Sequence, residues 1–151
     1  TDKTVADSDG NTPIHILISK NEDEKHLENL INWGYPIDTR NSKGYTPLAI
    51  AIEDDNIPLA KILLSKGANP FVSIDKHGTN AISIALKNNN KTMLENIVKY
   101  AGTLSDIQGN TILHYAAKTS TVSTKKLLKL TSRQLQTSFT GCTLQKLVKT
   151  M

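Results

Sequence analysis

Apolar residues occur in pairs of short runs separated by polar breaks, and this pattern is clearest between residues 41 and 70. An apolar run over 46–52 is followed by a polar break and a second apolar run over 59–64. Thr46 and Pro47 indicate a helix start, because a threonine hydroxyl caps free amides and the first helical turn tolerates proline. Gly67 indicates a helix end, where the backbone turns left-handed. The pattern predicts a turn, a short helix, a tight break, a second helix and a glycine stop.

This unit recurs along the chain at a nearly constant interval. Glycines placed two positions ahead of a Thr or Asn occur at positions 10, 44, 78, 109 and 141. The runs that follow them are related: Thr12-Pro13-Ile14-His15, Thr46-Pro47-Leu48-Ala49, Asn80-Ala81-Ile82-Ser83, Thr111-Ile112-Leu113-His114 and, more weakly, Thr143-Leu144. One such unit is too small to close a core, so the sequence predicts that the copies stack.

A period near 33 with Thr-Pro-Leu-His and a terminal Gly-Ala-Asn resembles the ankyrin repeat, over about residues 7 to 151. The resemblance implies an all-α ankyrin-repeat solenoid that forms a single domain over residues 1–151. Its repeats are expected at about 7–38, 39–72, 73–104 and 105–136, with a partial, capping repeat at 137–151. It also implies that His15 and His114 bond the backbone of the neighbouring turn and so tie repeats together.

Some positions depart from the most regular unit. The second helix of the first repeat is expected over 26–33, and Pro58 is expected to begin that of the second repeat. Trp33 at the end of the first repeat either covers the exposed end of the stack or anchors a partner. In the third repeat Asn80-Ala81 replaces Thr-Pro, and asparagines at 88–90 replace a glycine break. We therefore expect looser stacking there.

Charge is distributed unevenly along the chain. Residues 1–75 contain seven basic and twelve acidic residues, a net charge of −5, whereas residues 76–151 contain eleven basic and two acidic ones, a net charge of +9. Because a solenoid keeps sequence order as spatial order, one end should be negative and the other positive. The basic end is either a solvated face or a contact for an acidic protein. Nucleic acid is disfavoured, because only Phe139 could stack on bases and only Arg133 offers a guanidinium there.

Catalytic and cofactor chemistry finds no support in the sequence. The four histidines are spread over several repeats and the single cysteine, Cys142, is distant from most of them, which is not the clustered spacing of a zinc site. His114 lies one repeat from Cys142, beyond hydrogen-bond reach for a catalytic pair. There is no phosphate-binding glycine motif. The sequence predicts no enzyme, no cofactor and no metal.

The setting of the protein is only partly predicted. A single cysteine fits a reducing, intracellular compartment, and a secreted effector stays open as an alternative. No apolar run reaches the roughly 18 residues of a membrane span, so a membrane partner is disfavoured. We expect a monomer.

The resemblance implies that the protein binds a protein partner through the concave surface made by hairpin tips and first-helix faces. Carried over by position, the expected partner-binding residues are Asp9, Asn11, Lys43, Tyr45, Glu53, Asp54, Lys76, His77, Lys87, Ile107, Gln108, Lys118 and Phe139. Tyr45, Ile107 and Phe139 place apolar bulk at hairpin positions, which favours contact. The expected function is a non-catalytic interaction scaffold. The alternatives are an ankyrin arm of a larger protein, such as a delivered bacterial or viral effector, and a spacer without a partner.

Overall fold

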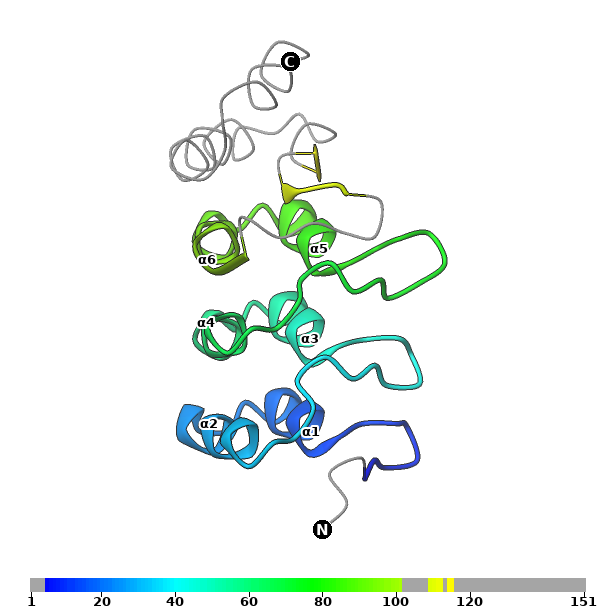
Figure 1. Cartoon of the computed structure of the whole chain (residues 1–151), viewed down its shortest axis with the longest axis vertical. Coiled ribbons are helices and arrows are strands. Elements are labelled where there is room, and N and C mark those ends of the chain that lie inside the picture. Colours follow the sequence, from blue (N-terminus) through cyan, green and yellow to red (C-terminus); the bar gives the residue numbers. More distant parts are fainter. Residues whose placement is uncertain (1–4, 102–108, 113, 116–151) are drawn as a thin grey trace.

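The computed structural model describes residues 5–101, 109–112, 114 and 115. Within these residues it contains six α-helices that form three antiparallel pairs (Figure 1). The first pair is α1 (Pro13–Ser19) and α2 (Glu24–Asn32), the second is α3 (Pro47–Glu53) and α4 (Ile57–Ser65), and the third is α5 (Ala81–Asn88) and α6 (Lys91–Ala101). This arrangement confirms the predicted all-α solenoid.

The pairs lie in two layers that run along the stack. The first helices α1, α3 and α5 contact one another in sequence order, and α2, α4 and α6 form the second layer. The loops between pairs project to one side of the stack as long hairpins (Figure 1). Sequence order is therefore spatial order, so the acidic first half of the chain occupies one end of the stack.

A column of equivalent aliphatic side chains holds the layers together. Ile14, Leu48 and Ile82 occupy the same position of successive repeats and are fully buried, and Ile112 continues the series. Burying each such side chain contributes about 1.5–3 kcal/mol relative to exposure. These side chains belong to one core cluster that includes buried residues of all three pairs, and the repeat period of the sequence follows this shared core.

The helix starts follow the predicted capping. The Thr46 hydroxyl accepts a hydrogen bond from the Ala49 amide at 3.2 Å, and the Asn80 side chain accepts one from the Ser83 amide at 3.0 Å. Asn80 thus replaces the threonine cap, as expected. Helix α2 begins at Glu24, two residues before the prediction, because Asp23 accepts from the Lys25 amide and caps it there. Similarly, Asn56 caps α4, which begins at Ile57, one residue before the predicted start at Pro58.

The breaks between paired helices differ from the prediction. A glycine was expected in this break, with asparagines in its place only in the third repeat. All three described breaks turn through a left-handed residue that is not glycine: Asn21, Asp55 and Asn89, with φ of 53°, 57° and 55°. Asparagine and aspartate reach this conformation because their side chains bond locally. The third break therefore has the same backbone as the others, and looser stacking there stays a prediction.

The last two expected repeats, 105–136 and 137–151, lie outside the described residues except for 109–112, 114 and 115. In that short segment, His114 Nδ1 accepts from the Thr111 amide at 3.0 Å. The same arrangement occurs at His15 and Thr12, so the start of the fourth repeat follows the first.

Candidate functional site

The hairpins that project from the stack share one internal design. The carboxylate Oδ1 of Asp7 accepts from the amides of residues 9 and 11 at 2.9 and 2.8 Å. Asn41 Oδ1 accepts from the amides of residues 43 and 45, both at 3.0 Å. Asp75 Oδ1 accepts from the amides of residues 77 and 79 at 2.8 and 3.0 Å. The pKa of both aspartates lies below its usual value, at Asp7 chiefly because of the bond from the Asn11 amide and at Asp75 chiefly because of bonds from the Thr79 side chain and amide. A side-chain oxygen at the same position of the first three repeats therefore fixes the tip of each of their hairpins.

Neighbouring hairpins are also bonded to each other. The Ser42 amide donates to the Asp9 carbonyl at 3.0 Å, and Asn41 Nδ2 donates to Asn11 Oδ1 at 2.9 Å. Between the second and third hairpins, Arg40 Nη2 donates to the Ile74 carbonyl at 3.1 Å. Each of these bonds contributes about 0.5–1.5 kcal/mol net. The hairpins are thus held as a row rather than as independent loops.

His15 joins the helix layer to the second hairpin. Its Nδ1 accepts from the Thr12 amide at 3.1 Å, which leaves the proton on Nε2, and Nε2 donates to the Tyr45 carbonyl at 2.9 Å. The ring is fully buried, and burial lowers the pKa of His15 because it disfavours the charged form. This confirms the structural role that the resemblance implied for His15. The partner of His114 in the next hairpin lies outside the described residues.

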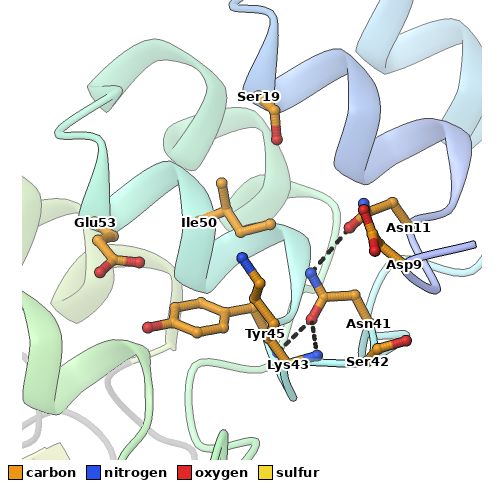
Figure 2. Close-up of a pocket in the computed structure, with 9 residues that line it drawn as sticks. All are labelled: Asp9, Asn11, Ser19, Asn41, Ser42, Lys43, Tyr45, Ile50 and Glu53. Carbon is orange, nitrogen blue, oxygen red and sulfur yellow. Dashed lines mark hydrogen bonds between the residues drawn. The ribbon is translucent and has the colours of Figure 1, made fainter.

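A groove of about 380 Å³ lies where the first two hairpins meet the first-helix layer (Figure 2). Its walls come from two hairpins and from the exposed faces of α1 and α3. The lining residues are Asp9, Asn11, Ser19, Asn41, Ser42, Lys43, Tyr45, Ile50 and Glu53. The surface combines one aromatic ring, one aliphatic side chain, charges of both signs and several amide and hydroxyl groups. Such a mixed, open surface can hydrogen-bond and pack against a peptide segment.

Within this groove, Glu53 lies beside Tyr45 and helps to shift the pKa of its phenol. The Tyr45 side chain is half-buried and points toward the carboxylate of Glu53 at the end of α3 (Figure 2). The pKa of Tyr45 is raised, first because burial disfavours the phenolate, and then because the carboxylates of Glu53 and Asp75 repel a second negative charge. The phenol therefore stays neutral and faces a negative environment.

Five of the expected partner-binding residues line this single groove: Asp9, Asn11, Lys43, Tyr45 and Glu53. The other described ones lie outside it, and all are exposed: Asp54 at the end of α3, Lys76 and His77 in the third hairpin, and Lys87 in the last turn of α5. The remaining four, Ile107, Gln108, Lys118 and Phe139, lie outside the described residues.

Four further residues line the groove: Ser19, Asn41, Ser42 and Ile50. Asn41 was overlooked because it builds the hairpin, yet its Nδ2 also crosses to the first hairpin. Ile50 was overlooked because it was counted within an apolar run. A signal for it was present, since Ile16, Ile50 and Ile84 occupy the same position of successive repeats and none of the three is fully buried. An isoleucine that recurs on the exposed side of a first helix indicates a surface that is available for contact.

A second, mostly apolar hollow lies on the end of the stack that carries the first pair. It is lined by Pro13, Ile16, Leu17, Glu22, His26, Asn29, Leu30 and Trp33. Trp33 is 63% exposed. Both roles considered for Trp33, covering this end of the stack and anchoring a partner, stay predictions.

Metal binding has no structural basis in the described part of the chain. Among residues 5–101, 109–112, 114 and 115, no group of three or more His, Cys, Asp or Glu side chains is placed to hold a metal ion. Within the same residues, no helix has the length and apolar character needed to cross a membrane.

Comparison with known proteins agrees with this geometry. A family model for ankyrin repeats, in three copies, matches residues 1–74. The chain belongs to the ankyrin-repeat family. It is 34% identical to human B-cell lymphoma 3 protein over 134 residues, which cover 83% of this chain and 29% of that protein. It is 26% identical to mouse Rabankyrin-5 over 117 residues, 76% of this chain and 10% of that protein. A putative ankyrin repeat protein of fowlpox virus is 31% identical over 111 residues, 70% of this chain and 26% of that protein.

The ankyrin-repeat family consists generally of protein–protein interaction modules that are typically non-catalytic. The chain spans less than a third of the length of each of these three curated relatives. An ankyrin segment of this kind is therefore shared with proteins that are several times longer.

Proposed function

We propose that this chain is a non-catalytic scaffold that holds a segment of a protein partner along its hairpins and first-helix faces, with the groove between the first two hairpins at its centre. The proposal is supported by the hydrogen bonds between the first two hairpins. The Ser42–Asp9 and Asn41–Asn11 bonds fix both walls of the groove without any partner. A surface that is already ordered loses little conformational entropy when it binds, which raises affinity.

The residues expected to contact the partner are the groove residues Asp9, Asn11, Lys43, Tyr45 and Glu53. His77 and Lys87 continue the same side of the stack into the third repeat. The uneven charge of the two halves of the chain supports an oriented encounter, because opposite potentials steer association and raise its rate. An association rate that is insensitive to salt between low and physiological ionic strength would contradict this steering.

Site-specific photo-crosslinking in cells tests the proposal. A photoreactive amino acid replaces Tyr45 in the groove, and in a matched control it replaces Lys25, which is exposed on α2 and lies outside both hollows. We expect discrete protein adducts from position 45 that are missing or much weaker at position 25. Adducts of equal intensity from both positions, or none from position 45, would contradict the proposal.

A second candidate is an ankyrin arm of a larger protein that brings an activity encoded elsewhere to its target. The observation that favours it is the length of the relatives, of which this chain matches less than a third. Sequencing the complete reading frame decides between the two. A catalytic domain in the same frame would favour the arm, and a frame of ankyrin repeats alone would favour the scaffold.

A further inference from the structure

The charged groups of the groove are not neutralised within the protein. Asp9 and Glu53 line it together with a single cation, Lys43. In the described part of the chain, the one ion pair joins Lys91 and Glu95 on α6. The carboxylates of the groove therefore face solvent without a cationic partner. An uncompensated carboxylate beside a concave surface favours a ligand that brings positive charge.

The aromatic ring of the groove adds a second attraction for a cation. Tyr45 contributes the ring, and its hydroxyl lies beside the Glu53 carboxylate with Asp75 nearby. The face of an aromatic ring attracts a cation within about 6 Å of its centre. Among the described residues, the one such contact already made is that of Lys99 with Tyr100, so the Tyr45 ring is not engaged in this way.

We propose that the groove receives an arginine side chain of the bound segment, with its guanidinium stacked on the Tyr45 ring and paired with the Glu53 carboxylate. This inference rests on the proposed function, since it names the chemistry of the partner at the same surface. Arginine fits better than lysine, because its planar head can stack on the ring and donate two parallel hydrogen bonds to a carboxylate at the same time. The net charge of −5 over residues 1–75 favours a basic segment at this end of the stack.

Lys43 opposes this attraction, because it places a positive charge in the same groove. Its side chain rises past Tyr45 in the groove (Figure 2). It makes neither an ion pair with Glu53 nor a cation–π contact with Tyr45, as far as the described residues are concerned. It therefore raises the local potential without occupying the site. Removing its charge should strengthen the binding of arginine, a direction that a generic loss of surface contacts would not produce.

Selection from a displayed library of random peptides tests the inference first. Peptides are selected against the whole chain, and binders are grouped by whether a photoreactive residue at position 42 captures them, since Ser42 is exposed in the same groove and its replacement leaves Tyr45 and Glu53 in place. Arginine enrichment among the captured peptides is the expected result. Captured peptides without that enrichment, or with lysine enrichment instead, would overturn the inference while leaving the proposed function intact. If no peptide were captured at position 42, both would fail.

The second step measures one selected peptide against its copy with citrulline in place of arginine, which keeps the shape and removes the charge. We expect the arginine peptide to bind about fivefold more tightly, as an exposed ion pair and a cation–π contact together predict. Glu53→Gln should reduce this preference to about two- to threefold, the part that the Tyr45 ring supplies, and Lys43→Gln should increase it. Glu28→Gln, the same charge change on the exposed face of α2, is the control and should leave it unchanged. An undiminished preference in Glu53→Gln, with helical circular dichroism intact, would overturn the pairing.

Discussion

The contact between the second and third hairpins can be tested by adding one methyl group at Gly44. A Cβ built at Gly44 would lie 2.0 Å from the Ile74 carbonyl oxygen, far inside van der Waals contact. Gly44 also has a φ of +86°, which costs other residues about 1–2 kcal/mol. Gly78, in the next hairpin, has a φ of +80° but nothing within 4 Å of its Cβ position. Replacing either glycine therefore strains the backbone to a similar extent, but only at Gly44 does the added methyl group meet the neighbouring hairpin.

The difference in free energy follows from the bond that the methyl group would break. To relieve the clash, the hairpins must separate, which releases the bond of Arg40 to the Ile74 carbonyl at 3.1 Å. This bond is worth about 1.5–3 kcal/mol, because its donor is charged. We expect Gly78→Ala to lower the free energy of unfolding by about 1–2 kcal/mol and Gly44→Ala by about 2–5 kcal/mol.

Urea unfolding followed by helical circular dichroism at neutral pH measures both variants against the parent chain. The reasoning predicts a larger loss for Gly44→Ala than for Gly78→Ala, with similar slopes against urea. Equal losses would refute it, because they would mean that the hairpins are not packed against each other and that only the left-handed backbone matters.

Three further outcomes are expected. Burial lowers the pKa of His15 below 6.5, so its contribution to stability is complete above that pH and is lost as the pH falls below it. His15→Gln should therefore flatten this part of the curve of unfolding free energy against pH. His77→Gln, at an exposed position, should not. Thr46→Ala removes a helix cap and should cost about 1 kcal/mol in thermal or urea unfolding. Amide exchange should be faster over 79–91 than over 46–64, since the third repeat lacks the stiff proline; equal protection would remove the idea of looser stacking.

Much of the fold could be predicted from the sequence because helix starts and ends depend on residues that are close together in the chain. Thr46, Pro47 and Gly67 mark helix ends by chemistry that acts within a few residues. A repeated mark also reveals stacking, since equivalent residues meet equivalent neighbours. The starts of α2 and α4 were missed by one or two residues because Asp23 and Asn56 cap from within stretches that read as polar breaks.

The groove could be predicted only as a set of positions. Tyr45 and Glu53 belong to a hairpin and to the end of a helix, and only the angle between these elements brings them together. The bond of the Ser42 amide to the Asp9 carbonyl involves backbone atoms, which carry no signal in residue type. Similarly, the left-handed breaks at Asn21 and Asp55 read as ordinary polar turns. Contacts between units that depend on orientation therefore required the structure.

The proposed binding requires hairpins that are ordered before any partner arrives. ¹⁵N relaxation of the free protein measures this directly at the amides of Ser42 and Tyr45, with Leu48 in α3 as the internal reference. We predict order parameters at the two hairpin amides close to those of the helix, about 0.85. Values below about 0.6 at Ser42 and Tyr45, with Leu48 still rigid, would contradict it, because the groove would then have no fixed walls.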